Sequence, residues 1–326
     1  MMAKQTPPPE LPAPPVSFVV PVYNNEANLR HCIESLRGQD FGDFEVVIVD
    51  DASTDASMSI AARLVAADKR IRYMRNEGHR GTYETHSEAI RQSRGELIWL
   101  MTPDQSLTRS NILSDCVKVF HHFPNLNMAF CRSRQANPNA QKAMLPYETI
   151  GNPMMMAMLP KADDGLLPAP DDKSCCIHGR DFFKRLIAGN CVALGSAIAR
   201  RRCFDIEIPL LLPLKESAAW FNWMIFSLTG DICFIPDAAV ESRSPLVQSP
   251  SRIIEGGKAT PAQENAIRCL ETVERYIQEE QLPASLKLMT QLARSRYKKA
   301  NHLPLSMGER TLYSLSRVVG SGSAAE

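Results

Sequence analysis

The sequence lacks three features that would point to a membrane protein or a nucleic-acid-binding protein. No apolar run approaches the roughly 18–20 residues of a membrane-spanning helix, and the N-terminus lacks the basic-then-apolar layout of a secretory signal. An excess of one charge is also missing, because 37 Lys and Arg stand against 36 Asp and Glu, for a net charge of +1. Duplex binding usually needs a basic excess. We therefore expect a cytoplasmic protein with no nucleic-acid partner.

Cysteine patterns that would indicate a disulfide framework or a zinc site are also absent. The nine cysteines are an odd number and include no Cys-x-x-C pair. Most of them lie inside apolar stretches, where a free thiol behaves as a small hydrophobe. Cys175 and Cys176 are adjacent and are expected in a loop. The sequence therefore predicts free cysteines.

With 326 residues, 44% of them hydrophobic and 22% charged, the chain is long and apolar enough to bury a core. Residues 1–15 hold six prolines and predict an extended, disordered tail. We expect two halves of a single domain at 16–130 and 131–245, followed by a helical extension at 246–326.

Short apolar runs alternate with amphipathic helical patterns through the first half of the chain. In the segment after residue 25, Leu29, Cys32, Ile33 and Leu36 fall on one face of a helix. This alternation predicts an α/β fold with a parallel sheet. The runs read as strands are residues 16–20, 46–49, 71–74, 97–101 and 128–131.

Polar or acidic residues follow three of these predicted strands. Tyr23 follows the first, Asp50 and Asp51 end the second, and Asp104 comes after the fourth. Open α/β sheets bind ligands at the carboxyl ends of their strands. A carboxylate there can accept the N–H of a uracil or guanine edge, and a tyrosine ring can cover the base. Acids at strand ends also often only cap the next helix, and that alternative stays open for Asp50 and Asp55.

In combination and order, the motifs resemble the family 2 glycosyltransferases, inverting enzymes with a GT-A fold. The motifs are Pro21-Val22-Tyr23-Asn24, Val49 to Asp55, and Gly95-Glu96 through Asp104. Asn190 to Phe204 and the helix with Ala219-Trp220-Phe221-Asn222-Trp223 extend the resemblance to about residue 245. It implies a Rossmann-like, mostly parallel sheet flanked by helices, with the C-terminal helical extension added.

The resemblance also implies a reaction and a site. A UDP-, GDP- or dTDP-linked sugar would be transferred to a glycan or lipid-linked acceptor, with inversion at the anomeric carbon, in bacterial polysaccharide assembly. Asp104 would ligate Mn²⁺ or Mg²⁺, and the loop 78–83 would line the nucleotide pocket. Trp220 and Trp223 are the candidate acceptor contacts, and we expect one of the two to be a core residue and the other to lie under the sugar. The nucleotide-binding positions that it implies are Pro21, Tyr23, Glu26, Asp50, Asp51 and Arg80.

Two positions depart from the family pattern. Thr102 stands where the family has the first acid of its Asp-x-Asp, so weaker metal binding is expected. Ala219 stands where the Asp of Asp-Trp-x-x-Trp removes the acceptor proton, and Glu216, one turn earlier, is the alternative base. The chain is therefore expected to turn over slowly. A catalytically silent nucleotide-sugar-binding or scaffold module is the alternative function.

Three histidines and the C-terminal segment are further candidates for ligand or surface contacts. His86 is a candidate ligand contact, whereas His121 and His122 at a helix end read as structural. Residues 261–319 pair apolar faces with basic residues, which suits either a membrane surface or packing on the catalytic domain or on a second copy.

Overall fold

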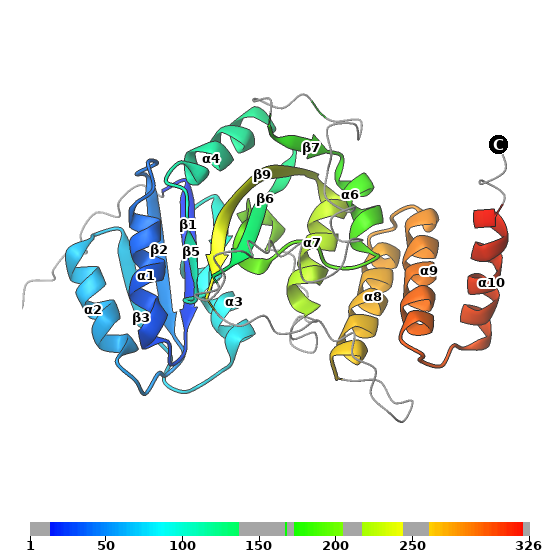
Figure 1. The fold of residues 1–326 in the computed structure, drawn as a ribbon, viewed down its shortest axis with the longest axis horizontal. Helices are drawn as coiled ribbons and strands as arrows, with labels where there is room; N and C mark the ends of the chain where they lie inside the picture. The colour runs from blue at the N-terminus through cyan, green and yellow to red at the C-terminus, as the bar shows by residue number, and fades with distance from the viewer. Residues whose placement is uncertain (1–13, 137–166, 168–172, 205–216, 244–260, 322–326) are drawn as a thin grey trace, which may run out of the picture.

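The computed structural model describes residues 14–136, 167, 173–204, 217–243 and 261–321, and one mixed sheet of nine strands runs through them (Figure 1). The strand order is β3-β2-β1-β4-β8-β6-β9-β5, and β7 pairs with β9. The strands are β1 (Val16–Val22), β2 (Phe44–Asp50), β3 (Ile71–Arg75), β4 (Leu97–Leu100), β5 (Gln105–Leu107), β6 (Leu126–Gln135), β7 (Cys175–Ile177), β8 (Ala197–Arg200) and β9 (Asp231–Ser242).

The first four strands in this order are all parallel, as the alternation predicts. Every residue of β1 and β2 is buried, because helices cover both faces of the sheet. Phe18 and Val20 pack toward one group of helices, and Val19 packs toward α3. The helices of this half are α1 (Glu26–Arg37), α2 (Ser57–Ala67), α3 (Thr82–Gln92) and α4 (Ile112–His122).

The rest of the sheet is mixed. β8 runs antiparallel to both β4 and β6, and β9 is parallel to β6 but antiparallel to β5 and β7. The expected boundary between residues 130 and 131 falls inside β6, so the sheet is continuous across it. A second core lies between this part of the sheet and α6 (Gly179–Leu186), α7 (Ala218–Thr229), α8 (Pro261–Glu279) and α9 (Ala284–Ala300). Short 3₁₀ turns at Leu194–Ser196 and Arg201–Cys203 flank β8.

The C-terminal helices stack in sequence on α7, at the end of the molecule away from β3 (Figure 1). The apolar face of α8, which includes Cys269, Leu270 and Val273, is buried against the second core. α10 (Met307–Ser321) is held to α9 by Lys298, whose ammonium lies 2.8 Å from a Glu309 carboxylate oxygen. The packing alternative therefore holds for α8 and α9. Among the described residues, no helix combines the length and the apolar character that crossing a membrane requires.

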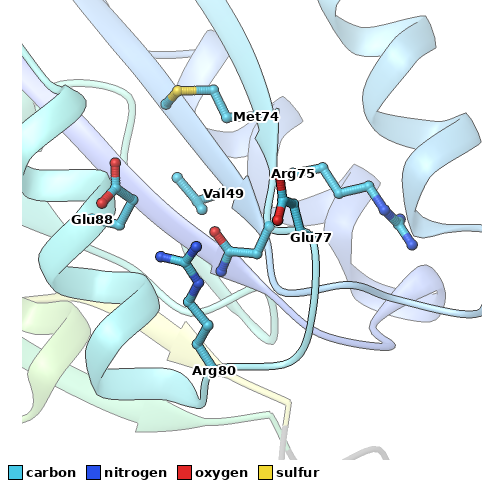
Figure 2. Close-up of a pocket in the computed structure, with 7 residues that line it drawn as sticks. Val49, Met74, Arg75, Glu77, Arg80 and Glu88 are labelled. Atoms are coloured by element: carbon cyan, nitrogen blue, oxygen red, sulfur yellow. The ribbon is translucent and has the colours of Figure 1, made fainter.

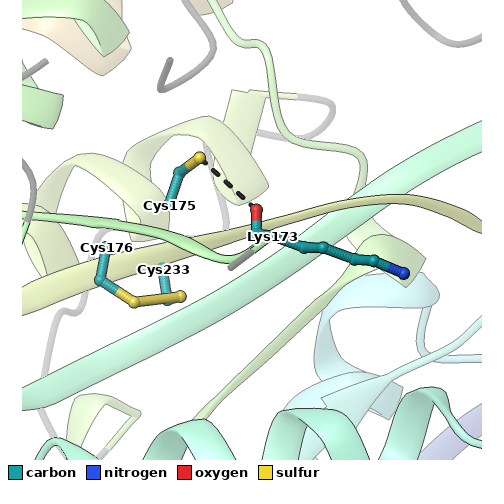
Figure 3. Close-up of a disulfide and its surroundings, with 4 residues drawn as sticks. All are labelled: Lys173, Cys175, Cys176 and Cys233. Atoms are coloured by element: carbon teal, nitrogen blue, oxygen red, sulfur yellow. Dashed lines mark hydrogen bonds between the residues drawn. A yellow bond between two sulfur atoms is a disulfide. The ribbon is translucent and has the colours of Figure 1, made fainter. Parts of the chain in front are cut away.

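The prediction that all cysteines are free is wrong at one pair. Cys176 lies on β7 directly opposite Cys233 on β9, and the two sulfurs form a disulfide (Figure 3). Cys175, one residue earlier, points away from this bond, and its thiol lies 3.7 Å from the Lys173 carbonyl oxygen. Residues 175–177 therefore form a strand rather than the expected loop. The pairing could not be read from spacing because 57 residues separate the two cysteines and only the strand register joins them.

Candidate functional site

The carboxyl ends of β1, β2 and β3 meet at one edge of the sheet and bring the predicted polar residues together. The backbone N–H of Asp51 donates to the Val22 carbonyl at 2.7 Å, and that of Asn76 donates to the Asp50 carbonyl at 2.8 Å. Tyr23, Asp51 and Asn76 therefore sit side by side on three adjacent strand ends. This is the edge where open α/β sheets bind ligands.

Asp51 is the most completely hydrogen-bonded residue of this edge. Its Oδ1 accepts from the backbone N–H of Arg80 at 2.9 Å and from the Asn76 amide at 2.8 Å. Its Oδ2 accepts from the backbone N–H of Gly81 at 2.8 Å, and His79 Nδ1 lies 2.9 Å away. Burial raises the pKa of Asp51, but the bonds from Arg80, Asn76, Gly81 and Thr85 together outweigh burial and lower it. Asp51 is therefore an ionised, fixed acceptor.

The loop that supplies these donors depends on Gly81, whose φ is +103°. That left-handed conformation, which suits glycine, turns two successive N–H groups toward Asp51 just before α3 begins. The family resemblance places the loop 78–83 at the nucleotide pocket, but it names neither Asn76 nor the bonds of this loop to Asp51. The sequence signal that could have found them is the polar and glycine-rich stretch between β3 and α3.

Tyr23 presents its ring at the same edge. The residue is 47% exposed, and its ring stacks on the His79 imidazole with centroids 4.1 Å apart and planes inclined by 33°. Pro21, by contrast, lies inside β1 with its side chain buried opposite Val49. The prediction that Pro21 contacts a ligand is therefore not met in this structure, whereas Tyr23 is accessible.

Asp50 faces internal partners rather than the open edge. Its carboxylate accepts from the backbone N–H of Ser53 at 2.8 Å, from the Tyr73 hydroxyl at 2.6 Å and from Arg75 at 2.9 Å. Burial and the Asp50 carboxylate raise the pKa of Tyr73 to about 12, so its hydroxyl stays a donor. Asp50 is fully buried, which favours the structural alternative over direct ligand contact.

Glu26 and Asp55 clamp the starts of two helices to one another. The backbone N–H of Glu26 donates to Asp55 at 2.9 Å, and the backbone N–H of Ala56 donates to the Glu26 carboxylate at 2.7 Å. Asp55 also accepts from the backbone N–H of Ser57, at 2.9 Å. These bonds satisfy N–H groups that a helix start leaves without partners. Both acids therefore fix the loops around Tyr23 and Asp51.

A cavity of about 460 Å³ opens next to this loop, between the end of β3 and α3 (Figure 2). The Arg80 guanidinium and the Glu88 carboxylate extend toward each other across it. Hydrogen bonds from Arg91 above all, and more weakly the Arg80 charge, lower the pKa of Glu88. Arg80 thus contributes its backbone N–H to Asp51 while its side chain is directed into the cavity. The remaining lining residues are Val49, Met74, Arg75, Asn76 and Glu77.

Asp104 lies in the turn between β4 and β5. Its Oδ2 accepts from the Ser242 hydroxyl at 2.8 Å, and its carbonyl accepts from the backbone N–H of Arg243 at 2.9 Å. The side-chain oxygen of Gln105 accepts a hydrogen bond from the backbone N–H of Thr102 at 3.0 Å. No group of three or more His, Cys, Asp or Glu side chains suited to a metal occurs in the part of the chain that the structure describes. A single carboxylate fits a divalent ion whose other ligands are phosphate oxygens and water.

The two tryptophans of α7 are core residues. Trp223 is fully buried and its indole N–H donates to the Val192 carbonyl at 3.1 Å. Trp220 is 6% exposed and donates to the Leu186 carbonyl at 2.7 Å. Neither ring offers a face to a sugar, so the predicted acceptor contacts are wrong for this structure. The three-residue spacing simply points both rings into the second core.

Ala219, on the same helix, is half-buried and packs against that core. Its methyl group can neither accept a proton nor ligate an ion. Glu216, the alternative base, lies outside the described residues, as do residues 205–215 before it. His86 turns inward, with Nδ1 2.8 Å from the Thr82 carbonyl oxygen, and burial lowers its pKa to about 4. The imidazole is therefore buried, and this structure does not expose it to a ligand.

Comparison with known proteins gives a family match over the first half of the chain. Residues 17–175 match the model of glycosyl transferase family 2. A GalNAc(5)-diNAcBac-PP-undecaprenol beta-1,3-glucosyltransferase of Campylobacter jejuni is 32% identical over 95 residues, 29% of this chain and 31% of that protein. The uncharacterized protein MT1568 of Mycobacterium tuberculosis is 34% identical over 124 residues, 38% of either chain. The chain thus spans well under half the length of these curated relatives.

Solved structures match over most of the chain. S. aureus TarS 1–349 aligns with a TM-score of 0.59 at 18% identity, covering 91% of this chain and 77% of that one. The same protein in complex with UDP-GlcNAc aligns with a TM-score of 0.53 at 17% identity, covering 87% and 81%. The mannosyltransferase PcManGT of Pyrobaculum calidifontis, in complex with GDP-Man and Mn²⁺, aligns at 0.50 and 14% identity, covering 94% and 80%. These likenesses show the GT-A fold.

Proposed function

We propose, from the match of residues 17–175 to glycosyl transferase family 2, that the chain takes its sugar from a nucleotide-diphosphate sugar. The acceptor in this proposal is a glycan or a lipid-linked glycan, and transfer inverts the anomeric carbon. The observation that carries the proposal is the fixed Asp51 carboxylate beside the exposed Tyr23 ring at the carboxyl edge of the sheet.

The nucleobase of the donor would lie at this edge of the sheet. An ionised carboxylate accepts a base N–H, and an aromatic ring covers the base face. Backbone N–H groups hold the Asp51 carboxylate in place before a ligand binds. Binding therefore costs little conformational entropy at this side chain. Solved GT-A neighbours that hold UDP-GlcNAc or GDP-Man support a nucleotide-sugar donor.

Asp104 is the residue that would hold a divalent ion, Mn²⁺ or Mg²⁺, together with the diphosphate. The ion would neutralise charge that develops on the leaving diphosphate. Because Thr102 supplies no carboxylate, we expect the ion to bind only when the nucleotide is present. Asp104→Asn should then abolish the metal dependence of nucleotide binding in a thermal-shift titration, with the fold intact. An unchanged Mn²⁺-dependent shift in Asp104→Asn would remove Asp104 from the metal site.

The chemical step needs a base that Ala219 cannot supply. The acceptor hydroxyl oxygen attacks the anomeric carbon, and the bond from that carbon to the diphosphate oxygen breaks. The nucleoside diphosphate leaves with the electron pair, and the hydroxyl proton must pass to a base within about 2.6–3.2 Å. We therefore propose that the chain binds donor but transfers slowly. The second candidate function, a silent nucleotide-sugar-binding module, is favoured by the same methyl group at position 219.

Release of nucleoside diphosphate from a panel of UDP-, GDP- and dTDP-sugars, with Mn²⁺ and an acceptor mixture, tests both functions. Ala219→Asp should raise release by about two orders of magnitude, because a general base typically contributes ~10²–10⁴-fold. Ala219→Asn is the matched control, since it has the same shape without the base.

The remaining outcomes separate the alternatives. A flat result for Ala219→Asp with loss of activity in Glu216→Gln would make Glu216 the base. No turnover in any variant, with nucleotide still bound, would leave the silent module as the function.

A further inference from the structure

One face of α9 stays open while other faces of the helix pack. Leu286, Met289 and Ala293 lie against the second core. The side next to α10 carries Lys298, which pairs with Glu309 at 2.8 Å. A further set of residues, spaced three and four apart, shares another face of the helix, and we call it the open face of α9. Its members are Ser285, Leu288, Leu292, Arg296 and Lys299, all exposed except the half-buried Leu292.

The charges of α9 have a single sign. The helix carries five Lys and Arg residues and no Asp or Glu. Two of these cations, Arg294 and Lys298, pair with carboxylates of α8 and α10. No ion pair joins Arg296 or Lys299 to a carboxylate in the part of the chain that the structure describes. The open face therefore presents two positive charges that the protein itself does not compensate.

Apolar side chains share the open face with these cations. Leu288 is 46% exposed, and Leu292 lies one turn further along the same face. Four large apolar side chains are exposed in the described residues, and two of them, Leu288 and Met307, belong to α9 and α10. These helices stand at the end of the molecule away from β3 (Figure 1). Leucines and cations on one helix face form the pattern of a helix that lies in a membrane interface.

A lipid surface with negative charge fits this combination better than a second copy of the chain does. A symmetric contact between two copies would set the open face against itself. Arg296 and Lys299 would then lie near their own counterparts, and like charges repel. A single helix contributes the open face, and a bilayer surface needs no matching groove. Long Arg and Lys side chains reach the head groups while neighbouring leucines enter the acyl boundary.

We propose that the open face of α9 binds an anionic lipid surface, with Leu288 and Leu292 at the acyl boundary and Arg296 and Lys299 at the head groups. Each cation near such a surface contributes about fivefold in affinity. Salt weakens this attraction because it screens the charges. The inference does not depend on the proposed nucleotide-sugar function, since β2 and α9 lie toward opposite ends of the molecule (Figure 1).

Co-sedimentation of the full chain with vesicles tests the proposal. Vesicles of phosphatidylcholine mixed with phosphatidylglycerol should pellet the protein at low salt, and vesicles of phosphatidylcholine alone should not. Arg296→Gln combined with Lys299→Gln should lower vesicle binding by about tenfold or more, and Leu288→Ser by at least about threefold. Arg268→Gln combined with Arg275→Gln is the matched control, because it removes two exposed arginines of α8 and should leave vesicle binding unchanged.

Several results would overturn the proposal. Absence of pelleting, or pelleting without regard to anionic lipid, would remove the anionic surface as the partner. An equal loss of vesicle binding in the α8 control would assign the effect to total charge rather than to the open face. Sedimentation velocity of the chain without lipid gives a further outcome, because a dimer that Leu288→Ser dissociates would make the open face an interface between two copies. UDP titration of the same variants should show unchanged affinity, which keeps this test separate from that of the nucleotide site.

Discussion

The two halves of the sheet differ in where their motif residues lie. In the half built on β1 to β4, the polar motif residues gather at one edge, where Asp51 is fixed and Tyr23 is exposed. In the half built on β6, β8 and β9, the motif residues pack in the core or hold strands together. Trp223 is buried in the core, and Arg201 donates to the Gly95 carbonyl at 2.7 Å, which ties β8 to the first half. Some motif residues of the first half, such as Tyr23, therefore stay accessible to a ligand, whereas Trp223 and Arg201 of the second half stabilise the fold.

This contrast predicts where a large aromatic can be removed without unfolding the protein. Trp223→Ala should lower the free energy of unfolding by about 3–5 kcal/mol, the usual cost of truncating a buried tryptophan. Tyr23→Ala, at an exposed position, should change it by no more than about 0.5 kcal/mol. Urea unfolding of both variants measures the difference. A stable Trp223→Ala protein that had lost only acceptor binding would reverse the assignment of that ring to the core.

A second prediction uses pH and concerns the first half alone. Burial lowers the pKa of His86 to about 4, against about 6.5 in an unfolded chain, so the unfolded state takes up this proton first. The contribution of neutral His86 to the free energy of unfolding is fully present above pH ~6.5. It falls as the pH drops toward 4, and below pH 4 no further loss comes from His86. The total loss should be about 3 kcal/mol at 1.36 kcal/mol per pKa unit.

His86→Leu should remove most of this slope between pH 6.5 and about 5, above the range in which the carboxylates of an unfolded chain titrate. His121→Leu, at an exposed position on α4, is the control and should keep it. Urea midpoints measured across this pH range decide the matter, and a slope that persists in His86→Leu would place its origin elsewhere.

The sequence predicts the first half well because its signals are local. The continuous apolar runs of β1 and β2 require burial on both faces, and Leu29, Cys32, Ile33 and Leu36 are all buried on α1 as their spacing indicates. Asp51 and Tyr23 could be placed at one edge because parallel strands end together.

Non-local features escape this kind of prediction. The Cys176–Cys233 bond depends on the register of β7 and β9, and β5 has only three residues and no pattern of its own. The contact between His79 and Tyr23 joins two loops that lie far apart in the sequence, and local periodicity does not describe it. The spacing of Trp220 and Trp223 is compatible with core residues and with a platform for a sugar. Only the burial of both rings in the structure shows that they are core residues.

The smallest expected effect is a gain in stability in the loop after β2. Ala52 has a φ of +63°, a left-handed conformation that costs a residue with a Cβ about 1–2 kcal/mol. Ala52→Gly should raise the free energy of unfolding by about 0.5–1 kcal/mol after the extra chain entropy of glycine is subtracted. Ala89→Gly, inside α3, is the opposite control and should lower it.

Calorimetric titration with UDP in the presence of Mn²⁺ tests most directly whether the first half is a nucleotide site. Saturable binding is expected for the chain as it stands and for Asp43→Asn, an exposed carboxylate at the amino end of β2. Asp51→Asn should weaken UDP by about 1–3 kcal/mol, roughly tenfold to more than a hundredfold, because the base N–H loses its charged acceptor. Equal UDP affinity in Asp51→Asn and Asp43→Asn would contradict the placement of the base at this edge.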